Sequence, residues 1–186
     1  MTNILEWPQD QHDPGGKVRL GVSSHIQSTA RFSSCGRYRQ LLTRCWDPNL
    51  PPILFIGMNP STADQHVDDP TVRKECGYAQ RWGYGSLIKC HVMDYRATHP
   101  KDLLTVVAQS DENLPIIQQQ LKKVDTVVAV WGKLNPKLQD CATKVWDLLK
   151  NFDGQVMCLG TNQDNSPRHP LYLKNDAQLQ PYRRQT

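Results

Sequence analysis

Four short apolar segments constrain the fold of this chain more than any other feature. Each has the length and composition of a strand that is buried on both faces of a sheet. Stretches with the apolar spacing of a helix lie between them. Because strand and helix alternate, we predict an α/β fold with a central, mostly parallel sheet and helices on both faces, a three-layer sandwich. The predicted strands are residues 53–57 (ILFIG), 86–93 (SLIKCHVM), 126–132 (TVVAVWG) and 155–160 (QVMCLG).

The first predicted helix has a clear beginning and end. Asp69 can cap its N-terminus, and Pro70 suits the first helical position, where a backbone N–H is not needed. Gly83 then ends the helix. Two further helices are predicted over residues 114–124 (LPIIQQQLKKV) and 141–152 (CATKVWDLLKNF).

The chain before the first of these strands follows a different pattern. Residues 23–46 predict a β-hairpin whose turn is the Ser-Cys-Gly sequence at 34–36, a small antiparallel addition to the core. At 186 residues the chain fits a single domain. We divide this domain into an N-terminal hairpin extension (1–50), the α/β core (51–173) and a polar, basic tail (174–186).

The composition limits the partners and the compartment. The net charge of +4 favours contact with phosphates without requiring it. No apolar run approaches the roughly 20 residues needed to cross a bilayer, and the start of the chain lacks the regions of a signal peptide. The six cysteines include no CxxC pair, which argues against a zinc or iron–sulfur site. We therefore expect a cytoplasmic monomer in which most cysteines are small, buried side chains.

Polar clusters follow each of the four predicted strands. In open α/β sheets, ligands bind outside the carboxyl ends of the strands, so we expect four loops to line one cleft. The first cluster is unusually rich in Asn, Ser, Thr and Asp, more than a single turn requires. The clusters are GMNPSTAD (57–64), HVMDYRATHP (91–100), WGKLNP (131–136) and TNQDNSPRHP (161–170).

These clusters belong to a set of motifs that resembles a bacterial and phage protein family of unknown function. The resemblance covers residues 30–173, nearly the whole chain. The motifs are NPSTAD (59–64), DDPT (68–71), RWGYG (81–85), RAT (96–98), WG (131–132) and PRHPLYL (167–173).

More remotely, the same layout is similar to the uracil-DNA glycosylase superfamily. There, the first strand leads into a water-positioning motif that resembles GMNPS at residues 57–61, and a later HP loop supplies a histidine, matched here by His169. His91 and the Trp131-Gly132 pair occupy matching places in the order. The resemblance implies a uracil-DNA-glycosylase-like fold and hydrolysis of an N-glycosidic bond in DNA. It also implies water as the nucleophile, with no metal or other cofactor.

The chemistry of base excision gives individual residues their expected catalytic roles. The reaction passes through an oxocarbenium-like sugar, so the site must hold a water, balance the positive sugar and stabilise the departing base. Asn59 would hold the water, and His169 would donate to the base. Asp68 and Asp69 would supply the anion and the general base. Structural roles compete with these, since Asn before proline starts turns and Asp69 can cap a helix.

Two departures from the uracil enzymes bear on the identity of the base. His91 stands where those enzymes carry Asn, and imidazole lacks the fixed donor and acceptor pair with which an amide reads uracil. The loop before His169 is also longer, which leaves room for a larger base. We therefore predict a flipped-out, hydroxymethylated or glucosylated pyrimidine as the target, with an abasic site as the product. Anti-phage defence and DNA repair are the expected roles.

The remaining predicted site residues are expected to contact the substrate. They are Met58, Ser61, Thr62, Asp64, Tyr84, His91, Asp94, Arg96, Trp131 and Arg168.

Two other functions also fit the sequence. The cleft could bind nucleic acid or a nucleotide without catalysis, or the clustered carboxylates of Asp64, Asp68 and Asp69 could hold Mg²⁺ for phosphoester hydrolysis.

Overall fold

The computed structural model describes residues 20–184. The first part of the predicted N-terminal extension (1–19) and the end of the predicted tail (185–186) lie outside the described residues. The strands are β1 (Leu20–Gly21), β2 (Gln27–Phe32), β3 (Arg39–Cys45), β4 (Pro52–Gly57), β5 (Val67–Asp68), β6 (Ser86–His91), β7 (Thr126–Ala129), β8 (Gln155–Cys158) and β9 (Gln180–Pro181). The helices are α1 (Pro70–Arg81), α2 (Asn113–Leu121) and α3 (Gln139–Leu149), with 3-10 helices η1 (Pro100–Leu104), η2 (Pro136–Leu138) and η3 (Pro170–Tyr172).

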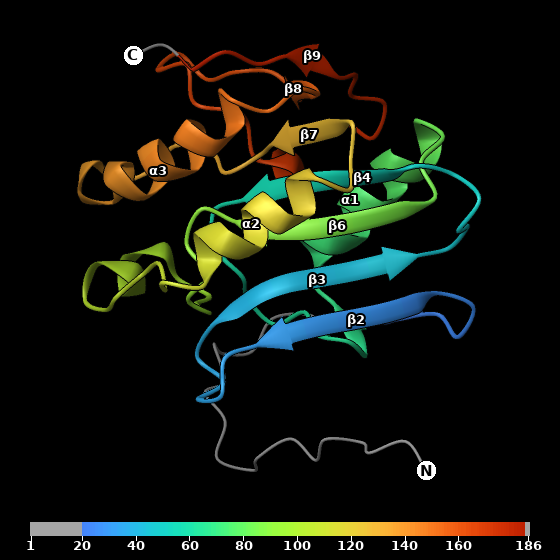
Figure 1. The fold of residues 1–186 in the computed structure, drawn as a ribbon, viewed down its shortest axis with the longest axis horizontal. Coiled ribbons are helices and arrows are strands. Elements are labelled where there is room, and N and C mark those ends of the chain that lie inside the picture. The colour runs from blue at the N-terminus through green and yellow to red at the C-terminus, as the bar shows by residue number, and fades with distance from the viewer. Residues whose placement is uncertain (1–19, 185–186) are drawn as a thin grey trace.

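Seven strands form one mixed sheet in the order β2-β3-β6-β4-β7-β8-β9 (Figure 1). The four central strands β6, β4, β7 and β8 run parallel to one another. The outer strands join antiparallel, and β1 and β5 form a separate two-stranded sheet. The predicted α/β fold is therefore confirmed, and the predicted parallel arrangement holds for the centre of the sheet. All four predicted strands form, and they are the four that make this centre.

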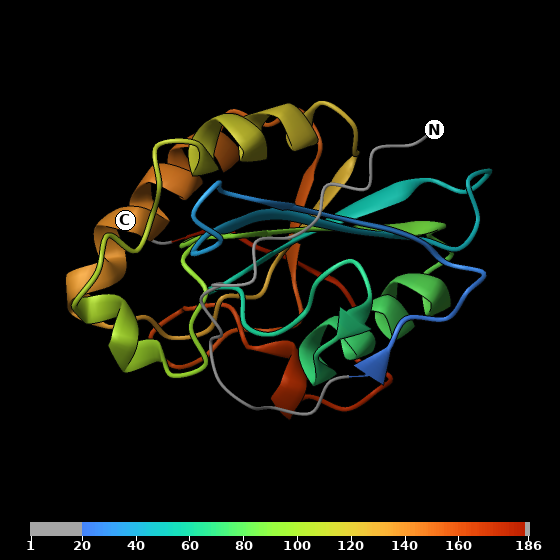
Figure 2. The same cartoon turned by 90° about the horizontal axis from the view of Figure 1, so that it is seen from below.

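Helices cover both faces of the sheet (Figure 2). On one face, Tyr78 of α1 shares a buried cluster with Phe55 of β4. On the other face, α2 and α3 pack together, with Ile117 and Val145 buried against strand residues such as Leu54. Neighbouring residues of β4 thus enter opposite clusters, as the alternation of side chains along a strand requires.

The predicted hairpin forms, and it is part of the main sheet. β2 and β3 pair antiparallel across a turn in which Gly36 adopts a φ of 68°, a conformation that suits glycine. β3 then pairs with β6, so the hairpin extends the sheet beyond its parallel centre. Within this extension, β3 carries the fully buried Leu42, and Ala30 of β2 packs against the same core cluster.

A β-bulge in β3 decides which way its first residue points. The pairing register skips Gln40, so one extra residue interrupts the alternation of side chains. Arg39 and Arg44 consequently lie on the same face of the sheet, although five positions separate them. Both guanidinium groups donate to the loop after β4, Arg39 to the carbonyl of Ala63 and Arg44 to that of Asp64.

The end of the chain departs from the predicted polar tail. β9 pairs with β8 at the edge of the sheet, and Tyr182 beside it is only 4% exposed. The Tyr182 ring contacts Trp131 and Trp146 edge-on, with centroids 5.8 and 5.7 Å apart. This aromatic side chain therefore completes the core of the α2 and α3 face.

The predictions about membrane-spanning segments and about buried cysteines can be compared with the structure. Within residues 20–184, no helix is long and apolar enough to cross a membrane. The cysteines divide by position in the fold, so the prediction of buried thiols holds for only some of them. Cys76, Cys90 and Cys158 are buried, Cys45 and Cys141 are half-buried, and Cys35 is exposed.

Candidate functional site

A cleft of about 360 Å³ opens at the carboxyl ends of the central strands. The chain leaves β4 through α1 on one face to reach β6, and it returns through α2 on the other face to β7. It therefore changes direction between β4 and β7, and a crevice at such a switch point is the usual ligand site of an open α/β sheet. All four predicted loops contribute. The polar lining residues are Arg39, Asn59, Ser61, Asp69, Thr71, Lys89, His91, Thr98, Trp131, Lys133, His169 and Tyr172.

Asn59 lines the cleft with its side-chain amide held in one orientation. Its Nδ2 donates to the carbonyls of Pro60 and Ala97 at 2.9 and 2.7 Å. These two bonds use both amide hydrogens, and no described residue donates to Oδ1. The oxygen is thereby left as a fixed acceptor, which is the role predicted for a group that positions a water.

Asp69 is both a helix cap and a cleft residue. Its Oδ1 accepts from the backbone N–H of Val72 at 2.9 Å, as predicted for the start of α1. The same carboxylate lines the cleft while being only 8% exposed. The structural and functional interpretations are therefore compatible, because the cap uses one carboxylate oxygen and a ligand can use the other.

His169 precedes η3 and has a defined tautomer when it is neutral. Its Nδ1 accepts from the backbone N–H of Leu171 at 3.3 Å. An accepting Nδ1 carries no proton, so the neutral ring carries its proton on Nε2. Gly132 adopts a φ of 71°, and the Cβ of His169 lies 3.6 Å from where a side chain at that position would begin. The third and fourth loops therefore meet at this histidine.

His91 lies at the carboxyl end of β6 and is only 3% exposed. Burial holds its pKa well below the usual value, and the nearby cations Lys89 and Arg39 act in the same direction. The ring is consequently neutral at neutral pH. No described residue pairs with its Nδ1, although that atom is buried. A neutral imidazole with one unused nitrogen is suited to reading a polar edge of a ligand.

Two charged residues beneath the cleft were missed by the sequence analysis. Lys89 comes from the middle of β6, and its Nζ donates to Oε1 of Glu75 on α1 at 2.6 Å. Both side chains are almost completely buried, and burial raises the pKa of Glu75 while Lys89 opposes that shift. A lysine inside an apolar strand was the available signal, because lysine is rarely buried without a partner.

Gly57 at the end of β4 leaves space for this pair and for His91. A Cβ atom at position 57 would lie 2.7 Å from Nζ of Lys89 and 3.3 Å from Cδ2 of His91. Any side chain there would displace the ammonium group or the imidazole. The glycine of the GMNPS motif is thus explained by close packing at the cleft floor.

Arg39 is the second cationic residue of the cleft that sequence analysis missed. It is 1% exposed, and only its Nη1 has an acceptor, the carbonyl of Ala63. No described residue accepts from Nε or Nη2. Burial lowers the pKa of the guanidinium to about 10, with Asp69 opposing the shift. Nothing in its local sequence distinguishes Arg39 from an exposed strand residue, since its position depends on the bulge.

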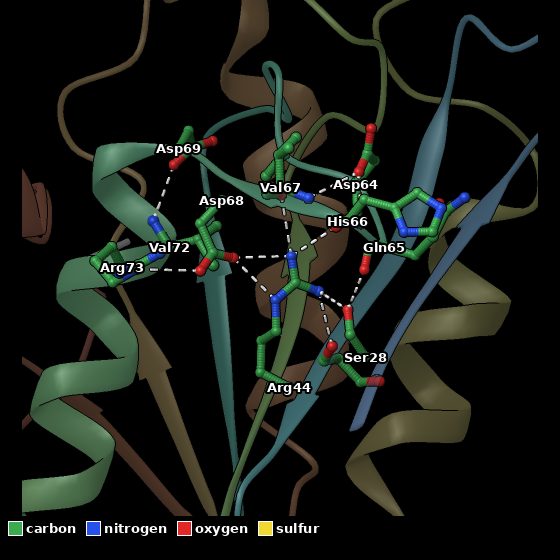
Figure 3. Close-up of polar contacts among 12 residues, drawn as sticks. Ser28, Arg44, Asp64, Gln65, His66, Val67, Asp68, Asp69, Val72 and Arg73 are labelled. Carbon is green, nitrogen blue, oxygen red and sulfur yellow. Dashed lines mark hydrogen bonds and ion pairs between the residues drawn. The ribbon is translucent and has the colours of Figure 1, made fainter. Parts of the chain in front are cut away.

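Asp68 lies outside the cleft lining, in a network that also holds Asp64 (Figure 3). Arg44 donates from Nε to Oδ1 of Asp68 at 2.9 Å, and Arg73 donates to Oδ2 at 3.2 Å. The Asp64 carboxylate accepts from the backbone N–H groups of His66 and Val67. Both aspartates therefore hold the loop that leads to Asp69, and the structure gives neither of them a position in the cleft.

Five other predicted contacts lie outside the cleft lining, three of them in loops near it. Asp94 accepts from the backbone N–H of Ser110 at 2.7 Å, and Thr62 is buried. The exposed Arg168 donates from Nε to the carbonyl of Thr161 at 3.1 Å. The loops that carry Thr62, Asp94 and Arg168 therefore line the cleft with other residues, not with these three.

The remaining two are Arg96 and Tyr84. Arg96 donates to the carbonyl of Gly36 at 3.1 Å and lies over the ring of Phe32. The Tyr84 hydroxyl donates to Thr126 at the start of β7, at the opposite end of the strands. Trp82 of the same motif stacks on Phe55 and Tyr78 in the core, so the RWGYG motif lies outside the cleft lining and does not offer the cleft a stacking surface.

The remaining predicted contacts do line the cleft. Ser61 shares a hydrogen bond with Thr98 across two loops at 3.2 Å, and Met58 packs partly into the core. Trp131 is 3% exposed, so most of its ring is core while one part lines the cleft. Within residues 20–184, no three His, Cys, Asp or Glu side chains are grouped to hold a metal ion.

The fold and the cleft define a class: an α/β protein with an open mixed sheet and a cleft at its strand switch point. Residues 37–171 match a family described as a protein of unknown function, DUF1643. Because this match covers most of the chain, the protein belongs to that family. No curated protein and no solved structure matches the chain.

Proposed function

We propose that this protein is a DNA glycosylase that hydrolyses the N-glycosidic bond of a flipped-out, modified pyrimidine. The observation that carries the proposal is the gathering of Asn59, Asp69 and His169 in one cleft at the strand switch point. They offer the amide oxygen, the carboxylate and the imidazole donor that base hydrolysis requires. The similarity of the motif order to the uracil-DNA glycosylase superfamily supports this choice and the finer assignment of the fold.

Each group has a defined task in the proposed reaction. Asn59 Oδ1 accepts a hydrogen bond from the attacking water and orients it. The free oxygen of Asp69 takes the water proton and balances the positive charge that develops on the sugar. Nε2–H of His169 donates to the base as it leaves with the electrons of the broken C–N bond. The water oxygen ends on the sugar, so the product is an abasic site and a free base.

The dimensions of the cleft fit a single base. Small-ligand sites in proteins occupy roughly 300–1,000 Å³, and this one has about 360 Å³. A duplex cannot enter such a space, so the target nucleotide must leave the stack, and pocket contacts must offset a cost of a few kcal/mol. The neutral His91 at the cleft floor supports reading of a base other than uracil, and we infer a hydroxymethylated or glucosylated pyrimidine.

The positions of the carboxylates disfavour the phosphoesterase alternative. Magnesium would need several oxygen ligands directed to one point. Asp68 is bound by Arg44 and Arg73, and Asp64 is bound by backbone N–H groups, so only Asp69 reaches the cleft. A non-catalytic module remains the other outcome of the experiment below.

The test is base release from defined DNA in the presence of EDTA. Purified protein is incubated with phage genomes that carry plain, hydroxymethylated or glucosylated pyrimidines. Mass spectrometry then identifies free bases, and alkaline cleavage counts abasic sites. We expect release from one genome type, lost in Asn59→Ala and retained in the matched control Asn49→Ala, an exposed residue that precedes the amino end of β4 and is not part of the cleft lining. Binding without base release from any genome would contradict the proposal and favour a binding module.

A further inference from the structure

The charges at the cleft are unequal. Three cationic side chains line it, those of Arg39, Lys89 and Lys133, against the single carboxylate of Asp69. Two carboxylates outside the lining pair with the lysines, Glu75 with Lys89 at 2.6 Å and Asp164 with Lys133 at 3.7 Å. Lys133 is largely exposed at the rim, whereas Arg39 and Lys89 are buried. The two buried cations therefore determine what the floor of the cleft can accommodate.

Arg39 has unused hydrogen-bonding capacity in a buried position. A guanidinium carries five N–H donors, and in the described part of the chain only Nη1 of Arg39 finds an acceptor. Burial is the main influence that disfavours its charge; Asp69 favours the charged form, and the nearby arginines Arg96 and Arg44 disfavour it. A buried cation with unmet donors is costly. A ligand that brings acceptors and negative charge would remove that cost on binding.

Lys89 adds a second cation that is fixed in place. Its ammonium group has three donors, and the bond to Glu75 uses one of them. The position of Nζ beside Gly57 puts the group at the cleft floor, next to the loop that carries Asn59. Because His91 is neutral, the positive charge at the floor comes from Arg39 and Lys89 rather than from the imidazole.

We propose that the floor of the cleft is an anion-binding site in which Arg39 and Lys89 hold a negatively charged group of the ligand. This group is the phosphate of the bound nucleotide, or an acidic base substituent in place of the neutral hydroxymethyl or glucosyl group considered above. The inference deepens the proposed function, and its choice of pyrimidine probes rests on that function. Arg39 supplies planar paired donors, which suit a carboxylate or phosphate, and Lys89 supplies a point charge.

The experiment compares charged and neutral probes by isothermal titration calorimetry of the full chain. The probes are 5-carboxycytosine, 5-hydroxymethylcytosine, deoxycytidine, deoxycytidine monophosphate and inorganic phosphate. We expect the charged member of at least one pair to bind about tenfold or more tightly than its neutral counterpart. Preference for 5-carboxycytosine identifies the base substituent as the source of the anion, and preference for the monophosphate identifies the nucleotide phosphate. Equal affinities within both pairs, or no binding of any charged probe, would overturn the proposal.

Variants of Arg39 test whether this residue causes the tighter binding of charged probes. Arg39→Gln should abolish the preference for charged over neutral probes, while Arg39→Lys, which keeps the charge, should retain part of that preference. Arg31→Gln is the matched control, because this arginine lies on the neighbouring strand with an exposed side chain that, within residues 20–184, pairs only with Glu112. Circular dichroism verifies that each variant is folded. Unchanged charge preference in Arg39→Gln would contradict the assignment even if Arg39→Lys gave no result.

The outcomes separate this inference from the proposed function. Anion binding that depends on Arg39, without base release from any DNA, would refute the glycosylase and leave the anion site in place. Base release together with equal affinity for charged and neutral probes would refute the anion site and leave the glycosylase in place. The base-release assay and the calorimetry can therefore each contradict one proposal without contradicting the other.

Discussion

Arg39 and Arg44 come from the same strand and the same face of the sheet, yet their surroundings are opposite. Arg44 donates to the Asp68 carboxylate, to the hydroxyl of Ser28 and to backbone carbonyls of the loop after β4. Arg39 donates to one carbonyl and borders the cleft. A buried charge with every donor satisfied stabilises one conformation, whereas a buried charge with unmet donors is available to a ligand.

This difference separates two kinds of buried polar group in the molecule. The Arg44 network fixes the loop of residues 64–69 and thereby the position of Asp69 at the start of α1 (Figure 3). Among the buried polar groups without a full set of partners in residues 20–184, Arg39 and His91 lie at the cleft, whereas Gln40 and Thr62 lie outside its lining. The satisfied Arg44 network therefore positions the cleft residue Asp69, while Arg39 brings a charge with unused donors to the same cleft.

Arg44→Met should give the largest loss of stability. It leaves the Asp68 carboxylate buried without its main partner, and removing one member of a buried ion pair costs about 3–5 kcal/mol. The free energy of unfolding measured by urea denaturation tests this prediction. The double variant Arg44→Met, Asp68→Asn should recover part of the loss, and a loss below about 1 kcal/mol in the single variant would contradict the structural role of Arg44.

Lys89→Met should cost a similar amount, about 3–5 kcal/mol, because it leaves Glu75 buried and unpaired. The double variant Lys89→Met, Glu75→Gln removes both charges and should restore most of the stability. Urea denaturation of the two variants and the wild type measures the difference. If the single and double variants were equally unstable, packing rather than charge would be the cause.

Acidification should destabilise the protein through His91. Its folded-state pKa lies well below the unfolded value near 6.5, so the unfolded state binds more protons as the pH falls. The stability present above pH 6.5 is therefore lost below it, with a slope of up to about 1.4 kcal/mol per pH unit. His91→Gln should flatten this slope, measured by urea denaturation from pH 7 to pH 5, and the exposed His25→Gln control should not.

Arg39→Met should change stability least, by less than about 1 kcal/mol, and in either direction. Replacing an unpaired buried cation with an apolar side chain of similar length removes a cost as well as one hydrogen bond. Urea denaturation beside Arg44→Met gives the direct comparison of the two arginines. A loss as large as that of Arg44→Met would show that Arg39 is a structural residue.

The central strands could be predicted from the sequence because burial on both faces leaves a continuous apolar segment. Asp69 and Pro70 likewise marked the start of α1 through local capping chemistry. Tyr182 could not be placed, since its burial depends on Trp131 and Trp146, which are distant in the chain. Sequence patterns therefore predict local elements such as strands and helix ends, but they do not predict contacts between segments that are distant in the chain.

Part of the candidate site could be predicted because the loops that follow parallel strands lie together at one edge of the sheet. Asn59, His91 and His169 were found because each follows a strand or lies at its end. The sequence offered a structural role for Asp69 and none for Asp68, yet Asp69 lines the cleft. Asp68 is held by Arg44, which is distant in the chain, and no local pattern shows that contact. Arg39 was missed for a related reason, since its orientation depends on one extra residue in β3.

That extra residue, Gln40, makes the site sensitive to the length of the chain rather than to its composition. Deleting it would restore the two-residue repeat of β3 and turn Arg39 to the opposite face, which α2 covers. Replacing Gln40 leaves the count unchanged and keeps the guanidinium where it is. A change of one residue in length would thus alter the charge of a cleft to which Gln40 itself contributes no side chain.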